Sequence, residues 1–455
     1  MFYFQESDLM VSRYCSRLVI STCLAMIWAL PAATVAGAVA SSVPPLPRIP
    51  GRVLNITRYG AVANAAIPAT AAIQKAINIC TRAGGGTVLI PSGTFLCGPI
   101  RLADHVDLRL AKGALLKMLP YGKYPFIGGK YPDFIRASNL HDVAITGHGT
   151  INGQGSRWWA MYRRRPNGTV PRLPHRPQML SMNNITRLVI SGIRLQDPAN
   201  THISIQNACK DVTIEHIVIH TPHNSPNTDG IDLSGHHILI THCRISDGDD
   251  CIAIGGSGHR SQTYFESQNI VISHCAFGYG HGMSIGSFTS GGIRNLLVKD
   301  CTFDHTTAGI RLKSNSGRAG LVENLTYENI SMRNVRWPIF ICSYYPHAPK
   351  RSWLAAPQSV NRYTPIWRNI RVINLTSVGS PVAGRIMGMP GAPVEDVLLR
   401  NVHITAKTGM LIADARNIEF QNSTITVSRG QAITSHSSRI RGIHLSRGTV
   451  IADAR

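Results

Sequence analysis

One short pattern recurs ten times along the chain of 455 residues and constrains the fold more than any other feature. Each copy has an apolar-x-apolar core, and most neighbouring copies start 21 to 32 residues apart. Side chains two residues apart point to the same face of a strand, so each copy predicts a short strand with one buried face. The copies are Leu188–Ile190, Val212–Ile214, Ile238–Ile240, Ile270–Ile272, Leu296–Val298, Leu325–Tyr327, Ile370–Val372, Val397–Leu399, Ile418–Phe420 and Ile443–Leu445.

A repeat of about 25 residues leaves no room for a crossover helix in each unit, so the strands must stack coil upon coil. A β-propeller is the alternative, but its blades need about 40 residues or more. We therefore predict an all-β fold over residues 41–455, a single-stranded right-handed parallel β-helix. Many copies follow a turn-favouring Asn or Asp, namely Asp211, Asn269, Asn295, Asn324, Asn369, Asp396 and Asn417.

The end of such a column exposes backbone and needs a cap, for which the segment Thr70–Arg82 is suited. It is followed by the helix-stopping glycines Gly84–Gly86. We expect an amphipathic helix at about residues 70–82 that closes the N-terminal end. Its apolar residues fall at positions i, i+3, i+4 and i+7, namely Ile73, Ala76, Ile77 and Cys80.

Two longer segments that contain proline, Arg157–Pro177 and Tyr344–Pro365, interrupt the repeat. We expect both to be loops that leave the column beside the same coils. They would then form walls of a cleft.

Residues 1–40 have the features of an export signal. Arg13 and Arg17 precede the apolar stretch Leu18–Leu30, and Ala38–Ala40 is an A-x-A cleavage pattern. A membrane anchor is the alternative, but the apolar run is short and contains polar residues. We therefore expect a secreted or periplasmic protein with no membrane contact after signal removal.

The formal net charge of +22, from 46 Lys+Arg and 24 Asp+Glu, predicts a surface that attracts polyanions. Nucleic acid, acidic polysaccharide and anionic membrane are all compatible with charge alone. Of the ten cysteines, Cys15 and Cys23 lie in the leader. Four others recur at one place in the repeat, which favours stacked buried thiols over bridges or a metal site: Cys209, Cys243, Cys275 and Cys301.

Four polar clusters, spaced about one coil apart, lie where a purely structural column requires none. They are Asn227–Asp229, Asp249–Asp250, His281 between two glycines, and Arg311–Lys313. Stacked coils are separated by roughly 4.8 Å, so these clusters should meet on one side of the column. Singly, each has a simpler explanation, since Asn and Asp before Gly form ordinary turns.

Three aspartates beside Arg, Lys and His suit an inverting glycoside hydrolase, in which one carboxyl protonates the leaving oxygen and a carboxylate activates water. Crowding of like charges should leave one carboxyl protonated at higher pH. No protein carboxylate is left to neutralise Arg311 and Lys313, so these two residues would bind the carboxyl group of a uronic acid. A Ca²⁺ site is a rival use of the aspartates, but the basic neighbours oppose it, and we expect no metal and no cofactor.

The motifs are similar to those of glycoside hydrolase family 28, the polygalacturonases, within the pectate-lyase-like superfamily. The resemblance begins near Ala72–Gln74, includes Gly149–Gly155, and is densest from Asn227 to Met332. Four segments resemble the family's signature elements: Asn227–Gly230, Gly248–Cys251, Gly280–Gly282 and Arg311–Lys313. The segment Gly255–Gly258 departs from the Lys-Ser-Gly of many relatives, which affects the expected sugar affinity.

The resemblance implies a role for each residue. Asp249 would be the general acid, Asp229 and Asp250 would position and activate water, and His281 would support the acid. Substrate would be bound by Asn227, Arg311, Lys313 and Tyr345.

The implied protein is a monomeric polygalacturonase that binds acidic polysaccharide and not nucleic acid. Two rivals stay open, a β-helical lyase that cleaves by β-elimination and a noncatalytic glycan-binding protein or adhesin. A lyase leaves an unsaturated, absorbing end group, whereas an adhesin would tolerate loss of Asp249.

Overall fold

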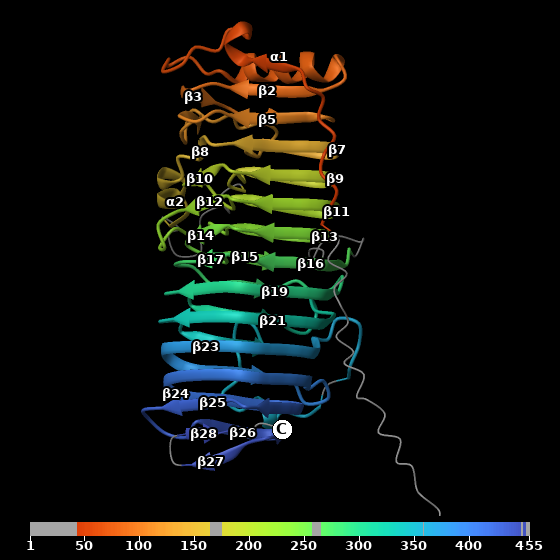
Figure 1. Cartoon of the computed structure of the whole chain (residues 1–455), viewed down its shortest axis with the longest axis vertical. Helices are drawn as coiled ribbons and strands as arrows, with labels where there is room; N and C mark the ends of the chain where they lie inside the picture. The colour runs from red at the N-terminus through yellow and green to blue at the C-terminus, as the bar shows by residue number, and fades with distance from the viewer. Residues whose placement is uncertain (1–42, 164–174, 257–264, 358, 447–448, 452–455) are drawn as a thin grey trace, which may run out of the picture. The chain divides into compact units, whose positions relative to one another are not determined.

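The computed structural model describes residues 43–163, 175–256, 265–357, 359–446 and 449–451. The predicted leader, residues 1–40, lies outside these ranges. All strands in the described part of the chain belong to one hydrogen-bonded sheet, and nearly all pairings are parallel. The strands stack coil upon coil, as Figure 1 shows. Their pairings divide the sheet into three ribbons that follow one another in each coil.

The first ribbon consists of stacked strands on the side of the column that carries the candidate active site. Its members are β4 (Ile100–Arg101), β7 (Ile135–Gly147), β9 (Leu180–Ser191), β11 (Ile203–Glu215), β13 (Ile231–Thr241), β15 (Ile252–Ile254), β18 (Met283–Ile285), β20 (Ala308–Lys313), β22 (Trp337–Cys342), the end of β23 (Ile366–Met387), β24 (Val394–Gln421) and β26 (Ile433–Arg441).

The second ribbon contains the later halves of β7, β9, β11 and β13, together with β1 (Val53–Asn55), β2 (Gly86–Ile90), β5 (Val106–Leu110), β16 (Ser267–Ser273), β19 (Ile293–Asp304) and β21 (Leu321–Arg333). The third contains β3 (Gly93–Cys97), β6 (Ala114–Met118), β8 (Thr150–Asn152), β10 (Arg194–Gln196), β12 (Val218–His220), β14 (Arg244–Ser246), β17 (Ala276–Phe277) and β25 (Thr424–Val427). Two final strands, β27 (His444–Ser446) and β28 (Thr449–Ile451), pair antiparallel.

The predicted parallel β-helix is thus confirmed, and its repeats are the stacked strands of the second ribbon. Leu188 lies beside Val212, which lies beside Ile238, and the same register continues along the column. The tenth repeat was placed wrongly: Ile418 pairs with Ile440, not with Ile443. The pattern is hidden there because Gly442 takes the place of the second apolar residue.

Asn and Asp residues form the corner between the first and second ribbons. All seven that precede the predicted repeats adopt a left-handed backbone, with φ between +51° and +60°, which Asn and Asp tolerate better than other residues with a Cβ. Their side chains form a ladder: the Nδ2 atoms of Asn295, Asn324 and Asn369 donate to the preceding Asn at 3.0, 3.1 and 2.6 Å. Each coil therefore turns at the same place as the coil before it.

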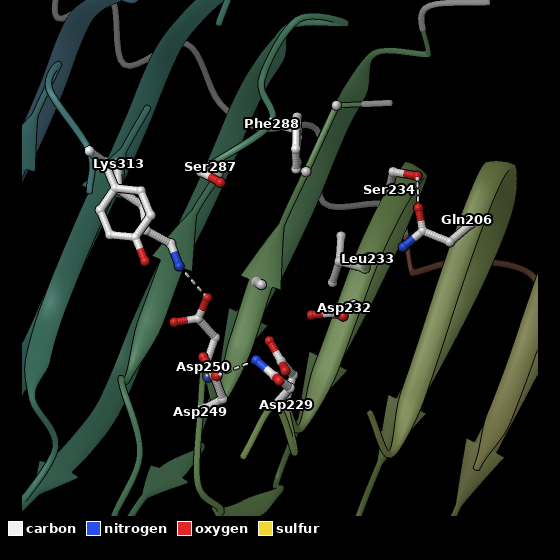
Figure 2. Close-up of a pocket in the computed structure, with 16 residues that line it drawn as sticks. Gln206, Asp229, Asp232, Leu233, Ser234, Asp249, Asp250, Ser287, Phe288 and Lys313 are labelled. Atoms are coloured by element: carbon white, nitrogen blue, oxygen red, sulfur yellow. Dashed lines mark hydrogen bonds and ion pairs between the residues drawn. The ribbon is translucent and has the colours of Figure 1, made fainter. Parts of the chain in front are cut away.

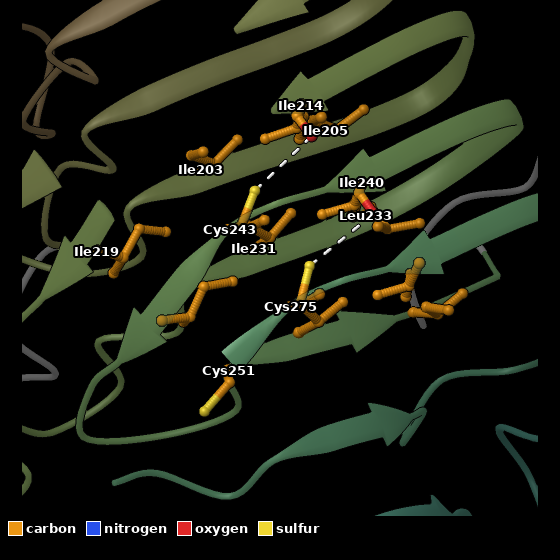
Figure 3. Close-up of a cluster of buried hydrophobic side chains, with 14 of the residues drawn as sticks. Ile203, Ile205, Ile214, Ile219, Ile231, Leu233, Ile240, Cys243, Cys251 and Cys275 are labelled. Carbon is orange, nitrogen blue, oxygen red and sulfur yellow. Dashed lines mark hydrogen bonds between the residues drawn. The ribbon is translucent and has the colours of Figure 1, made fainter. Parts of the chain in front are cut away.

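The core is a column of inward-pointing apolar side chains from all three ribbons, part of which Figure 3 shows. Ile231 stacks on Ile203 and is itself followed by Ile252, and all three are fully buried. Each such side chain contributes about 1.5–3 kcal/mol by leaving water. All eight cysteines in the described ranges are buried and free, which confirms the predicted stacked thiols.

Helix α1 (Thr70–Arg82) covers the N-terminal end, as predicted, and Ile73, Ala76, Ile77 and Cys80 are all buried. The segment expected as a loop from Arg157 instead begins within helix α2 (Ser156–Arg163), which buries two tryptophans. Residues 164–174 of that segment lie outside the described ranges. Short 3₁₀ helices occur at η1 (Ile56–Tyr59) and η2 (Ser352–Leu354).

Candidate active site

The register of the first ribbon brings the predicted clusters together. Strands β13, β15 and β18 are paired in register. Two residues before the start of each strand lies a polar side chain: Asp229, Asp250 and His281 respectively. Because paired strands lie about 4.8 Å apart, these three residues occupy the same position on three successive coils. Asp249 precedes Asp250 directly, and Figure 2 shows the three aspartates converging.

Asp250 is the electrostatic centre of the cluster. Its Oδ1 accepts hydrogen bonds from Arg311 Nη1 at 2.5 Å and from Ser284 Oγ at 2.8 Å, and its Oδ2 accepts one from Lys313 Nζ at 2.5 Å. Burial alone would raise the pKa of Asp250, but Lys313, His281 and Arg311 outweigh it and hold this pKa well below its usual range. Asp250 is therefore a carboxylate throughout the ordinary pH range.

This arrangement corrects one expectation about Arg311 and Lys313. The sequence suggested that neither had a carboxylate to bind, yet both form ion pairs with Asp250, whose side chain is only 4% exposed. The correction has a simple cause: parallel stacking places Arg311 next to Ser284 on the adjacent strand, within reach of the preceding coil.

Asp249 is the more accessible of the adjacent aspartates, with 21% of its side chain exposed. Its Oδ2 accepts a hydrogen bond from Asn227 Nδ2 at 3.3 Å, and its Oδ1 accepts one from the backbone N–H of Asp250 at 3.0 Å. The backbone N–H of Asp249 donates to Oδ1 of Asp247 at 3.0 Å. These contacts fix the carboxyl group while leaving it open to the pocket.

Asp229 and its neighbour Asp232 are carboxyl groups of the pocket whose pKa values are raised. Burial raises the pKa of Asp229 well above its usual range, and the charges of Asp232, Asp249 and Asp250 raise it further. Burial also raises the pKa of Asp232 to about 7, with the charge of Asp250 adding to the effect and a hydrogen bond from Thr201 opposing it. Burial contributes more to both shifts than the crowding of like charges does. These shifts fall on Asp229 and Asp232, not on Asp249, the residue expected to be the acid.

His281 faces both carboxylates of the adjacent pair. Its Nδ1 lies 3.0 Å from Oδ1 of Asp249 and 3.5 Å from Oδ1 of Asp250, although the ring direction does not complete a hydrogen bond to either. Burial tends to lower the pKa of His281, but Asp249 and Asp250 outweigh it, so this pKa is raised. A protonated imidazole beside Asp249 and Asp250 is therefore favoured.

A pocket of about 460 Å³ opens above the aspartates and crosses the strands of six successive coils (Figure 2). Tyr345 lies at one end, where its ring centroid is 5.1 Å from Lys313 Nζ and 5.5 Å from Cζ of Arg311. The predicted loop Tyr344–Pro365 thus contributes a wall of the pocket, as expected. The lining residues include Gln206, Asn227, Asp229, Asp232, Ser234, Asp249, Asp250, Ser287, Phe288, Lys313 and Tyr345.

Sequence reasoning missed two residues of the cluster, Asp232 and Ser284. Asp232 lies between Ile231 and Leu233, both fully buried or nearly so, and strand alternation alone would have placed it on the outer face. Ser284 is buried, and its hydroxyl donates to Asp250. No sequence signal pointed to Ser284, because a serine within a strand is an ordinary residue.

The side chains of Asp249, Asp250 and His281 are close enough to share a metal ion. Arg311 and Lys313 already neutralise Asp250, however, and a cation there would meet two positive side chains at short range. The donor set therefore fits an acid–base site better than a metal centre.

A parallel β-helix whose outer face carries a carboxylate cluster beside Arg, Lys and His defines a class, the β-helical glycosyl hydrolases. The sequence model of glycosyl hydrolases family 28 matches residues 80–436. The chain belongs to this family.

Individual relatives agree with this assignment. An endo-polygalacturonase of Pectobacterium carotovorum subsp. carotovorum is 33% identical over 362 residues, which cover 74% of this chain and 84% of the relative. An exopolygalacturonase of Zea mays is 31% identical over 371 residues, covering 78% and 84%. The solved polygalacturonase of Erwinia carotovora ssp. carotovora superposes with a TM-score of 0.69 at 29% identity, covering 82% of this chain and 98% of that one. Within the described residues, no helix is long and apolar enough to cross a membrane.

Proposed function

We propose that this chain is a secreted polygalacturonase that hydrolyses α-1,4-galacturonosyl bonds of pectin and polygalacturonate with inversion of configuration. One observation carries the proposal: the pocket holds an accessible carboxyl group, Asp249, directly beside a permanently ionised one, Asp250. Glycoside hydrolysis by a pair of carboxyl groups needs these two functions, a proton donor and an ionised carboxylate. Inversion also requires about 6.5–9.5 Å between the acid and the water-activating carboxylate. Side-chain oxygens of Asp249 and Asp250 lie within 4.8 Å of each other, so the proposed inversion rests on the family and not on the spacing of this pair. The relatives named endo- and exopolygalacturonase support the choice of substrate.

Asp249 is proposed as the acid because its carboxyl group is the accessible one of the adjacent pair and can reach a glycosidic oxygen in the pocket. His281, 3.0 Å away, stabilises the carboxylate that forms once the proton has left. Asp250 accepts a proton from the attacking water, and Asp229, one coil away, helps to orient that water. Arg311 and Lys313 keep Asp250 in its ionised form.

The substrate carboxylate would be bound by the hydrogen-bond donors that Asp250 leaves free. Lys313 has three N–H donors and Arg311 has five, and Asp250 uses one nitrogen of each. Lys313 also lines the pocket, and Tyr345 lies over both cations. The formal net charge of +22 attracts a polyanionic polymer over a longer range.

Asp249→Asn tests the assignment with polygalacturonate as substrate and reducing ends as the readout. Removing the acid should lower kcat by about 10²–10⁴-fold with KM little changed. Asp396→Asn is the matched control, since it makes the same substitution at an exposed residue of the second ribbon. An Asp249→Asn variant with wild-type activity would overturn the proposed acid.

Two further measurements address the remaining parts of the proposal. Proton NMR of the first product should show the anomer opposite to that of the substrate, whereas an unsaturated, ultraviolet-absorbing end group would identify β-elimination. The amino-terminal sequence of protein recovered from the culture medium or periplasm should begin after Ala40, as the A-x-A pattern predicts. Full-length protein retained in the cytoplasm would refute export.

A further inference from the structure

The outer face of the first ribbon continues past the catalytic cluster. On this face one row of stacked residues runs from Ser284 to Arg311, then to Phe340 and to Arg385 on the next two coils. Neighbouring strands lie about 4.8 Å apart, so Arg385 lies roughly 10 Å beyond Arg311. The pocket also runs across the strands, from Gln206 towards Tyr345. A polymer that follows the pocket therefore leads towards Phe340 and Arg385.

Trp337, Phe340 and Arg385 form a compact aromatic–arginine cluster. The Arg385 guanidinium lies 5.1 Å from the centroid of the Trp337 ring and 5.9 Å from that of Phe340. The two rings meet edge to face, with centroids 5.7 Å apart. All three side chains are partly exposed. Phe340 also packs against the buried Cys342, Met387 and Ala413, which fixes its ring in place.

Arg385 carries an uncompensated charge. Within the described ranges no carboxylate lies at ion-pair distance from it, and its buried Nε has no hydrogen-bond partner. Its titratable neighbour is the thiol of Cys342, whose pKa is raised by burial, so the thiol stays neutral. A guanidinium has five N–H donors in a fixed fork that matches a carboxylate, so Arg385 beside the two rings can bind one.

The aromatic rings supply the second half of a sugar site. Tryptophan and phenylalanine present flat apolar faces that pack against the C–H face of a sugar ring, while the guanidinium binds its carboxylate. A purely structural cation–π contact would explain the ring positions. It would not account for a partly exposed arginine, in line with the pocket, that has no carboxylate partner among the described residues.

We propose that Trp337, Phe340 and Arg385 bind a galacturonate unit of the substrate two coils beyond Arg311. The proposal rests on the proposed function and deepens it, because it makes affinity depend on oligomer length. Short oligogalacturonides that end at Arg311 gain nothing from the cluster, whereas longer ones place a uronate over Arg385.

Arg385→Gln tests this with oligogalacturonides of increasing length, measuring kcat and KM for each. KM for long oligomers should rise roughly tenfold, the effect of one charge-assisted contact, while kcat/KM for the shortest cleaved oligomer stays at the wild-type value. Arg400→Gln is the matched control, because it removes the same charge from an exposed residue of the second ribbon. Trp337→Ala, a second variant that keeps the charge, should reproduce the length effect.

The outcomes separate the two proposals. If wild type releases no reducing ends from any galacturonan, the proposed function fails. If wild type is active and both Arg385→Gln and Trp337→Ala keep wild-type KM for long oligomers, only the proposed binding site is overturned. An equal rise in KM for Arg385→Gln and Arg400→Gln also overturns it, since net charge would then explain the effect.

Discussion

The ion pair between Lys313 and Asp250 makes a quantitative prediction about stability. Lys313 Nζ and Asp250 Oδ2 are 2.5 Å apart, and their side chains are 7% and 4% exposed. Lys313→Met keeps the length and apolar stem of the side chain but removes the charge. The substitution therefore leaves Asp250 with Arg311 and His281 as its ion-pair partners.

The expected cost follows from the burial of the pair. Breaking a buried ion pair by removing one partner destabilises a protein by about 3–5 kcal/mol, because the other charge stays buried. Arg311 and Ser284 continue to bind Asp250 at 2.5 and 2.8 Å, so the loss should fall near the lower end, about 3 kcal/mol. Urea unfolding at pH 7 measures it as a lower midpoint with an unchanged slope.

The depressed pKa of Asp250 predicts how the loss of stability in the variant changes with pH. The folded-state pKa of Asp250 is depressed, so its contribution to stability is present above the unfolded pKa of about 3.9 and is lost as pH falls through the folded pKa. Lys313→Met raises that folded pKa. The difference in the free energy of unfolding between wild type and Lys313→Met should therefore be largest at neutral pH and should shrink below about pH 4.

A double variant separates charge from packing. In Lys313→Met/Asp250→Asn the buried group is neutral, so the double variant should be more stable at pH 7 than Lys313→Met alone. Equal destabilisation of Lys313→Met at pH 7 and pH 3.5, with no recovery in the double variant, would refute the electrostatic argument.

Three further predictions concern the cap, the histidine and the thiols. Ile73→Ala in α1 should lower the free energy of unfolding by about 2–5 kcal/mol, because Ile73 is fully buried against the column end, whereas exposed Lys75→Ala should change little in the same urea titration. The pKa of His281 is raised, so the stability it contributes is present below about pH 6.5 and lost as pH rises through the folded value. When melting temperatures are measured over a pH series, the His281→Gln variant should not show this loss of stability with rising pH. A variant profile identical to that of wild type would contradict the prediction. The eight buried thiols should react with a thiol reagent only after denaturation, and a reductant-sensitive melting temperature would reveal a bridge instead.

Much of the fold could be predicted because each coil repeats the same physical requirement. Inward positions must be apolar and corners must adopt a left-handed backbone, so Ile, Val, Asn and Asp return at coil spacing. Gly442 shows where this reasoning fails, because one glycine at an inward position hides the last coil. The short helix α2 was missed because it lies outside the repeat and its pattern spans only two turns.

The meeting of Asp229, Asp249, Asp250 and His281 could also be predicted, since coil spacing alone stacks them. The ion pairs within the cluster could not be predicted, because coil spacing does not determine which neighbour a flexible side chain reaches. Lys313 and Arg311 therefore turned out to bind Asp250 rather than standing free. Their roles in catalysis stay predictions for the experiments above.

The position of the site within the stack has a consequence for slow unfolding. In a column each coil contacts only the coils beside it, so structure is lost first by fraying from the ends. The polar cluster of the candidate site lies on the coils of β13 to β20, with α1, β2 and β5 among the elements before it and β23, β24 and β26 after it. Several coils must detach from either end before a side chain of this cluster loses a neighbour. The terminal coils can therefore unfold first without disturbing the site. On heating, activity should persist after the first strand structure has been lost.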